Sequence, residues 1–407
     1  MTVRKLIGKI HLWLGLASGL VVFLVSISGA IMVFEKEIRW ATGTSSYDRT
    51  VTVPVPEQNA PAASPSLIFQ KSLEVVPRGG TYQYFFTGEQ ENNVIINWFY
   101  HPGNEVADIP AGYREIHQNP YTGEVILNEL WEGGFWGWMV KFHTSLLLPS
   151  EIGHQVVGWA TVTFILMLIT GLVLWFPKSK KGYKQRFSVK WGASFKRVNY
   201  DLHNVLGFYV LGVVIIIALT GLVWSFDWFR SGVYFMAVGE ALTEHQEILS
   251  TYHPEAVPQT SDQLFRLIDR VTATTLDQYP EVYRYSVSYP MDSTASIAVS
   301  ILTEQGKNYD RHDEYIYDRY TGELIASEKW NEQNAGERIM HLNYPIHLGL
   351  IGGLPTKILA FLASLIAASL PVTGFYIWWN ATRWGRKRKT KKRRGNKKTF
   401  RQIEIAG

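Results

Sequence analysis

The 407 residues of this chain include no cysteine. This absence excludes disulfide bonds, thiolate ligands for iron–sulfur clusters, covalent c-type haem attachment and a cysteine nucleophile. The sequence also lacks the short motifs of nucleotide-binding loops, zinc proteases and α/β-hydrolases. With these signatures missing, the distribution of hydrophobic, basic and histidine residues becomes the main guide to function.

Hydrophobic residues make up only 46% of the chain, but they are concentrated in four windows that contain almost no charge. These windows are Leu12–Phe34, Val156–Phe176, Val205–Trp224 and Ile358–Trp379. Each is close to the roughly 20 residues that a helix needs to cross about 30 Å of hydrocarbon. The sequence therefore predicts four membrane-spanning helices. The first is too long for the hydrophobic part of a typical signal peptide, so we expect it to be retained.

Acidic residues are missing from three short basic segments: the N-terminus, Lys178–Arg197 and Arg383–Arg401. Glu35–Glu151 and Asp227–Lys357 contain almost all the acidic residues. Because short basic segments stay in the cytoplasm, we expect both termini there and two large domains on the other side. A basic tail directly after a span more often binds anionic lipid than nucleic acid, so membrane lipid is the expected partner and no nucleic acid is expected.

The predicted domain boundaries follow the alternation of spans and long segments. They are a first span at 1–35, an outer domain at 36–150, a second span at 151–177, a cytoplasmic loop at 178–200, a third span at 201–227, a second outer domain at 228–352, a fourth span at 353–380 and a basic cytoplasmic tail at 381–407. Both outer domains are expected to mix helices and strands, with Pro54–Pro65 as a linker. The predicted strands are Thr81–Phe86, Val94–Tyr100, Tyr283–Tyr289, Ala298–Leu302 and Tyr315–Tyr317, and the predicted helices are Ser66–Val75 and Ser261–Thr272.

The chain also repeats itself, which is a strong indicator of architecture. Each half contains a His-x3-Gly segment, a Ser-Gly or Thr-Gly pair, a Tyr-Thr-Gly-Glu turn, a second histidine and a further Thr-Gly pair. In order, the first half has His11, Gly15, Ser28-Gly29, Asn119–Ile126, His143 and Thr170-Gly171, and the second has His203, Gly207, Thr220-Gly221, Asp318–Ile325, His347 and Thr373-Gly374. The sequence thus predicts an α-helical membrane bundle of four spanning helices from two parallel repeats. Two extracytoplasmic α+β domains are expected beside it, with Gly123 and Gly322 at positive φ in hairpin turns.

This order of motifs resembles the PepSY-associated transmembrane protein family, which includes iron-regulated membrane proteins and siderophore reductases. The resemblance covers about Lys5 to Trp384. It implies PepSY-like outer domains, haem b within the bundle and, for some members, reduction of ferric siderophores. It also implies a bacterial inner membrane protein with periplasmic domains. Several relatives carry a flavin reductase domain, but no glycine-rich nucleotide motif occurs in this sequence.

Histidines at equivalent places in the two halves are the candidate cofactor ligands. His11 and His203 begin spans at the same predicted depth, and Gly15 and Gly207 follow each four residues later on the same helix face. Imidazole is a common axial ligand of haem iron, and a nearby glycine leaves room for a flat macrocycle. The alternative is that each histidine only marks the membrane interface, but two equivalent positions favour ligation.

His143 and His347 form a second equivalent pair before the second and fourth spans. We expect them to hold a second haem b at the outer end of the bundle. His154, in the first turn of the second span, and His341 are alternative ligands that could replace one member of this pair or line a substrate site. A non-haem metal is a weaker alternative, because no carboxylate accompanies the histidines.

These observations predict a dihaem transmembrane oxidoreductase, in effect a haem b-dependent metal reductase. Its expected partners are a cytoplasmic electron donor of unknown identity and a ferric siderophore or another iron chelate. The alternatives are a haem-free peptide-binding or regulatory membrane protein, and a transporter. A transporter would have spans broken near the middle of the membrane, and Pro371 is the only candidate for such a break.

Overall fold

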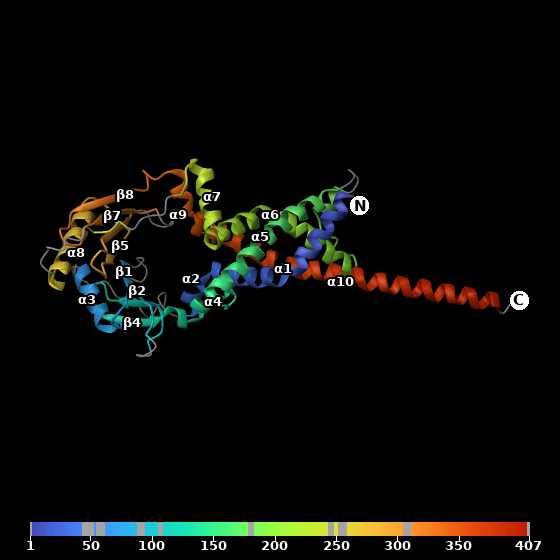
Figure 1. The fold of residues 1–407 in the computed structure, drawn as a ribbon, viewed down its shortest axis with the longest axis horizontal. Coiled ribbons are helices and arrows are strands. Elements are labelled where there is room, and N and C mark those ends of the chain that lie inside the picture. Colours follow the sequence, from blue (N-terminus) through green and yellow to red (C-terminus); the bar gives the residue numbers. More distant parts are fainter. Residues whose placement is uncertain are drawn as a thin grey trace.

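A computed structural model describes residues 2–42, 53, 62–87, 94–104, 109–177, 183–242, 248–250, 259–303 and 311–404. Figure 1 shows a bundle of long helices next to a β-sheet that carries two further helices. Both chain ends lie at the end of the bundle that is far from the sheet (Figure 1). The predicted linker Pro54–Pro65 lies mostly outside the described residues, and Pro65 begins a helix.

The four predicted spans are confirmed as helices that are long and apolar enough to cross a membrane. They are α1 (Val3–Val33), α5 (Ser150–Trp175), α6 (Phe195–Ser225) and α10 (Leu354–Glu404), of which Leu354–Thr382 has the composition of a span. Large apolar side chains cover their outer surfaces, such as Leu20, which is 70% exposed. The exposure of so much apolar surface to water is unfavourable, whereas the hydrocarbon chains of a membrane would solvate it.

Inside the bundle, the spans pack through small and branched side chains. The buried cluster consists of Val22, Phe164, Leu168, Val210, Val214, Ala363 and Ala367. Small residues such as the two alanines of α10 let helix backbones approach closely in a membrane protein. Pro371 lies within the continuous helix α10, so the expected mark of a transporter, a span broken at this proline, is absent.

The strands of both halves form one antiparallel sheet. They are β1 (Tyr82–Thr87), β2 (Ile95–His101), β3 (Gly112–Gln118), β4 (Val125–Leu130), β5 (Arg284–Tyr289), β6 (Ile297–Leu302), β7 (Asp313–Tyr317) and β8 (Leu324–Glu328). Their order is β4-β3-β2-β1-β5-β6-β7-β8, so β1 and β5 join the two halves. The five predicted strands are confirmed, whereas the joining of two domains into one sheet was not predicted.

Two hairpin turns confirm the expectation for the Tyr-Thr-Gly-Glu segments. Gly123 connects β3 to β4 with φ of 71°, and Gly322 connects β7 to β8 with φ of 72°. A left-handed backbone of this kind favours glycine, because a Cβ would be strained there. Each of the two edge strands, β4 and β8, therefore follows the same kind of hairpin turn, with a glycine at positive φ.

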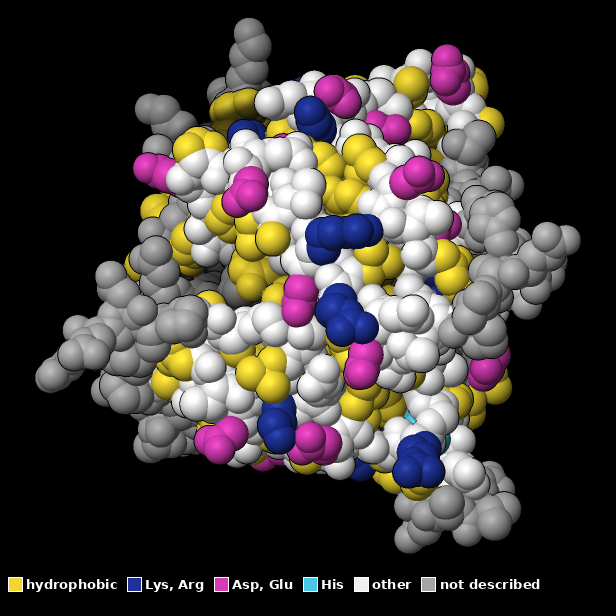
Figure 2. Space-filling model, turned by 90° about the vertical axis from the view of Figure 1, so that its left-hand side faces the viewer, with side chains coloured by type: hydrophobic (Ala, Val, Ile, Leu, Met, Phe, Trp, Pro, Cys, Tyr) yellow, Lys and Arg dark blue, Asp and Glu magenta, His cyan; other side chains and the backbone are white. Residues whose placement is uncertain are grey.

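One face of the sheet is covered by two helices, α3 (Pro65–Val75) and α8 (Ser261–Leu276). Both helices were predicted from the sequence and are confirmed by the structure. Their apolar sides meet residues such as Phe85 and Val287, which are fully buried. Ser64 caps the start of α3, and Thr260 with Gln263 forms a capping box on α8. Figure 2 views this outer end, where side chains of both charges are scattered among apolar ones.

Short helices connect the sheet to the bundle. They are α2 (Glu35–Thr42), η3 (Trp131–Gly133), α4 (Phe135–Ser145), α7 (Asp227–Val238), α9 (Ala335–His347) and η6 (Leu350–Gly352). The helices α4 and α9 pack against α1 and α6 respectively. Each carries a candidate histidine near its C-terminal end, so the connectors bring these histidines onto the spans.

Candidate functional site: two histidine pairs

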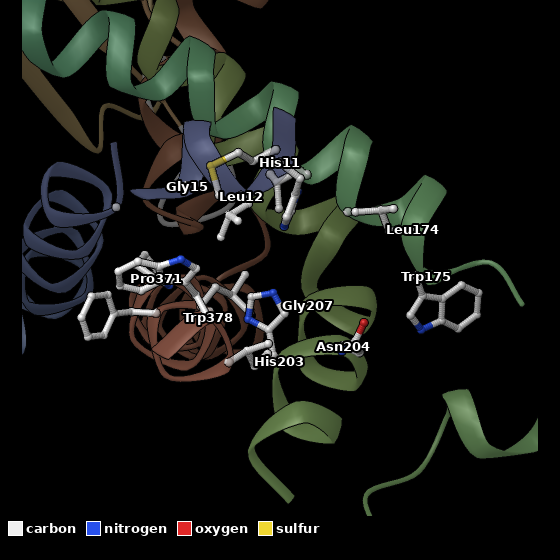
Figure 3. A pocket seen from close by; sticks show the side chains of 18 of the residues that line it. His11, Leu12, Gly15, Leu174, Trp175, His203, Asn204, Gly207, Pro371 and Trp378 are labelled. Atoms are coloured by element: carbon white, nitrogen blue, oxygen red, sulfur yellow. The ribbon is translucent and has the colours of Figure 1, made fainter. Parts of the chain in front are cut away.

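The first histidine pair lies at the end of the bundle far from the sheet. His11 of α1 and His203 of α6 have ring centres 6.4 Å apart, and their ring planes are nearly perpendicular at 86°. Both side chains point into the same cavity (Figure 3). The sequence placed these two residues at the same depth, and the structure brings their rings together.

Each ring of the first pair is held by a threonine of another span. His11 Nδ1 lies 3.0 Å from Thr170 Oγ1, and His203 Nδ1 lies 2.9 Å from Thr373 Oγ1. Thr170 donates its only hydroxyl proton to the backbone of its own helix, at Leu166 O, and Thr373 does the same at Ser369 O. The hydroxyl oxygens must therefore accept a hydrogen bond from Nδ1–H, which leaves Nε2 as the ring atom with a free lone pair.

The second histidine pair lies at the end of the bundle near the sheet. The ring centres of His143, from α4, and His347, from α9, are 6.2 Å apart. His143 Nδ1 lies 3.0 Å from Ser28 Oγ and 3.0 Å from Val25 O, both in α1. A backbone carbonyl only accepts hydrogen bonds, so this Nδ1 carries the proton and Nε2 has the free lone pair.

His347 is anchored in the same way by α6. Its Nδ1 lies 2.9 Å from Thr220 Oγ1 and 3.0 Å from Ile217 O. The pKa values of His143 and His347 are both lowered to about 4, mainly by burial, and for His347 the neighbouring His143 ring contributes to this shift. Both rings are therefore neutral near pH 7, which is the form that binds a metal.

A glycine faces each of the four rings. Added Cβ atoms on Gly29, Gly171, Gly221 and Gly374 would lie 3.0 to 3.3 Å from the Cε1 atoms of His143, His11, His347 and His203 respectively. These are the glycines of the four Ser-Gly and Thr-Gly pairs, so one dipeptide supplies both the hydroxyl and the space for the ring. The sequence analysis used these dipeptides only as markers of the repeat and missed this role.

Gly15 and Gly207 were expected to clear the space beside His11 and His203. Both line the same cavity as those histidines. Their nearest neighbours, however, are other side chains: an added Cβ on Gly15 would lie 2.9 Å from Met167 Cε, and one on Gly207 would lie 3.4 Å from Leu370 Cδ2. The two glycines shape the cavity wall, while the rings are contacted by glycines of other spans.

The cavity at the first pair has a volume of about 840 Å³, within the range of roughly 300–1,000 Å³ that is typical of small-molecule and cofactor sites. Apolar side chains dominate its lining, including Phe164 and Trp378. Arg4 and Arg186 also belong to the lining. A cavity of this size and lining suits a large, mostly apolar molecule that carries acidic groups.

The two pairs lie at different levels of the bundle. His11 and Gly29, which contacts His143, are both on α1 and are separated by 18 residues. At about 1.5 Å per residue, the two levels are about 27 Å apart along the helix. The pairs therefore form two separate sites.

The two alternative ligands lie elsewhere. His154 is exposed on α5. His341 of α9 is 5.5 Å from the ring of His312 and 6.2 Å from that of Trp330, and it contacts Gln333. The structure thus brings His143 together with His347, and it places neither His154 nor His341 in that pair.

The composition of the sites limits what they can bind. Among the described residues, no group of three or more His, Asp or Glu side chains could hold a metal ion, so each pair offers two protein ligands. Structural and catalytic zinc sites use three or four protein ligands, whereas a haem macrocycle supplies four nitrogens and needs only axial ligands. Two imidazoles on opposite sides of one metal, each with a metal–nitrogen distance of about 2 Å, have ring centres about 6 Å apart. Both pairs fit haem by this test.

A family model described as "PepSY-associated TM region" matches residues 9–381 of the chain. The match includes nearly all of the four spans, the sheet and all four histidines of the two pairs. No curated protein matches the sequence.

Proposed function

Since the chain belongs to the PepSY-associated TM region family, we propose that it is a dihaem transmembrane oxidoreductase that reduces ferric iron. The observation that carries the proposal is the pair of sites in which two half-buried imidazoles lie next to one another, with 6.4 Å and 6.2 Å between ring centres. In both, the Nδ1 atoms are fixed by hydroxyl or carbonyl groups, so the Nε2 atoms are available as axial ligands.

The residues of this chain hold and orient the ligands. Haem b, when bound, supplies one-electron chemistry between the ferric and ferrous states. The Ser and Thr hydroxyls fix the tautomer and the rotation of each imidazole, and such outer partners also tune the metal. At the first pair, Arg4 and Arg186 line the cavity and would supply positive charge for the acidic groups of haem. Val22, Phe164 and Leu168 of the apolar cluster line the same cavity, so the surroundings of the bound group would be largely apolar.

We further propose that the two halves are parallel repeats and that the sheet lies in the periplasm of a bacterium, with both termini in the cytoplasm. Electrons would enter near His11 and His203 from a cytoplasmic donor and leave near His143 and His347. The acceptor would be an iron chelate, such as a ferric siderophore, at the sheet side. Reduction to ferrous iron weakens its binding by hard oxygen donors, so the chelate would release its metal.

The haem content of the purified protein tests the proposal. Pyridine haemochrome analysis of protein made with ample haem should find about two haems b per chain, as two bis-imidazole sites require. His11→Ala and His203→Ala should each lose the same haem, as judged from the visible spectrum. The double variant should lose no more haem than either single variant, because both substitutions disrupt the same site.

The other pair should behave in the same way. His143→Ala and His347→Ala should each remove the other haem, whereas His154→Ala and His341→Ala, the control variants, should retain both. A colourless protein would refute the proposal. Ferric chelate reduction by the dithionite-reduced protein should be lost with the His143–His347 haem, and full activity without that haem would refute the proposed route.

A further inference from the structure

A second cavity lies where the first half of the sheet meets the bundle. Its volume is about 610 Å³, and it is enclosed by α2, the β3–β4 edge, η3 and the start of α4. Trp136, in its wall, is buried on α4 seven residues before His143, or about 10 Å along that helix. The cavity is thus distinct from the histidine pairs and is close to the second of them.

Charges in the wall of this cavity are partly balanced. The buried Arg39 guanidinium lies 2.9 Å from Glu35 and 3.7 Å from Glu115, and it stacks 5.7 Å from the ring centre of Trp136. Glu115 also contacts His117 Nε2 at 2.9 Å. The positive charge of Arg39 is therefore already paired within the wall.

Negative charge and aromatic surface remain for a ligand. Glu129, opposite Glu115 across the β3–β4 ladder, also lines the cavity; it is exposed and forms no ion pair with any residue that the structure describes. Trp131 and Phe135 line the cavity beside it. A carboxylate without an ion-pair partner next to aromatic rings is an environment that favours binding of an organic cation.

The second half of the chain contains the same arrangement of two glutamates and a tryptophan, but there arginine side chains lie over the tryptophan ring. Glu314, Glu328 and Trp330 stand at the same offsets from the Gly322 turn as Glu115, Glu129 and Trp131 do from the Gly123 turn. There the guanidinium groups of Arg311 and Arg338 lie 5.3 Å and 5.9 Å from the Trp330 ring centre. Within the described part of the chain, no cation lies over the ring of Trp131.

We propose that the cavity between α2, the β3–β4 edge and α4 binds an organic ammonium ion. Glu129 would supply the counter-charge, and Trp131 would supply the aromatic face that arginines cover in the second half. This inference goes beyond the proposed reductase, because the binding requires no haem.

Binding of radiolabelled choline tests this inference. The full-length protein in a neutral maltoside detergent would be examined by equilibrium dialysis, with the uncharged isostere 3,3-dimethylbutan-1-ol as competitor. We expect saturable binding of one choline per chain and no competition by the isostere. Glu129→Gln and Trp131→Leu should each weaken binding at least tenfold, because one removes the counter-charge and the other the cation–π contact.

Matched controls come from the second half. Glu328→Gln and Trp330→Leu alter the equivalent positions outside the cavity and should leave choline binding unchanged. The exposed position of Glu129 makes its substitution harmless to folding, which thermal unfolding would verify. Absence of saturable binding, equal competition by the isostere, or equal losses in the controls would overturn the inference. The visible spectrum of each sample distinguishes the failure of this inference from the failure of the proposed reductase function. A protein that contains no haem but binds choline would support this inference and refute only the reductase proposal.

Discussion

At the scale of single residues, the recurring unit is an imidazole, a hydroxyl and a glycine from two different helices. The hydroxyl proton of Thr170 is committed to its own helix backbone, so the oxygen can only accept from His11. The same logic applies at Thr373 and His203. A serine or threonine thus fixes the protonation of a histidine without any carboxylate, which suits an apolar interior because no further charge is buried.

Replacing Thr170 by valine tests this role. The change removes the hydroxyl at constant shape, so the Nδ1–H of His11 loses its acceptor, a loss of about 1 kcal/mol in a buried hydrogen bond. Loss of such an outer partner typically lowers metal affinity 10–100-fold. We therefore expect Thr170→Val to release haem from the first site at least tenfold more readily in transfer to apomyoglobin, and to shift the reduction potential of that site.

Thr161→Val is the control for this prediction. Thr161 lies on the same helix, and its hydroxyl donates only to Val157 O. Haem release and potential should match those of the unaltered protein. Equal effects of both substitutions would show that Thr170 acts on helix α5 as a whole and not on His11.

The histidines themselves could be predicted from sequence, because they recur at the same places in both halves and next to predicted spans. Their partners could not. Ser28 and His143 are far apart in the chain and meet only through the packing of α4 on α1. The recurrence of Ser-Gly and Thr-Gly in every span was the signal that could have identified them.

At the scale of helices and strands, the close approach of α4 to α1 depends on Gly29. An added Cβ would lie 3.0 Å from the His143 ring, closer than side-chain carbons normally approach. The ring is also fixed by Ser28 and Val25, so it cannot move away without breaking these hydrogen bonds. The position of α4 and that of the second histidine pair are therefore set together.

Gly29→Ala should accordingly disturb the second site and leave the first intact. We expect the variant to keep one haem per chain, with overpacking of about 1–3 kcal/mol at the α1–α4 contact. Gly212→Ala, in span α6, is the control because no atom lies within 4 Å of the added Cβ. The measurement is the haem-to-protein ratio, and two haems in Gly29→Ala would contradict the argument.

Elements with a clear pattern were predictable, and those with mixed composition were not. The strands rich in aromatic and branched residues were found, as were the four spans. Strands β3, β4 and β8 were not among the predicted strands. In β3 the signal is weak because the strand buries the polar residues Glu115, His117 and Gln118, which are atypical of strands. The pairing of β1 with β5 joins segments about 200 residues apart, and no local pattern indicates such a contact.

At the scale of the whole molecule, the charge distribution follows the architecture. The basic segments flank the bundle end that is far from the sheet, where Figure 1 shows both termini. Almost all acidic residues are in the two long sequence segments, Glu35–Glu151 and Asp227–Lys357, that contain the strands of the sheet. By the positive-inside rule, the sheet is expected outside the cytoplasm.

Reporter fusions test this orientation. An enzyme that is active only in the cytoplasm should work when fused after Gly407 and fail when inserted near Ala60, which lies outside the described residues. A periplasmic reporter should give the opposite result. A fusion at Tyr183, between α5 and α6, is expected to behave like the one after Gly407. Reversed signals would overturn both the orientation and the direction of electron flow.

The seam between β1 and β5 has a consequence for how such a chain assembles. Equivalent strands of the two halves pair antiparallel, with Phe85 opposite Val287, as two identical subunits would across a twofold axis. An isolated half would present β1 as an open edge, which invites pairing with another copy. In the fused chain this dimer-like contact is intramolecular, so its strength no longer depends on protein concentration. Two halves produced as separate polypeptides should therefore associate through the sheet. Both histidine pairs should form only when the two halves are associated, because each pair takes one histidine from each half.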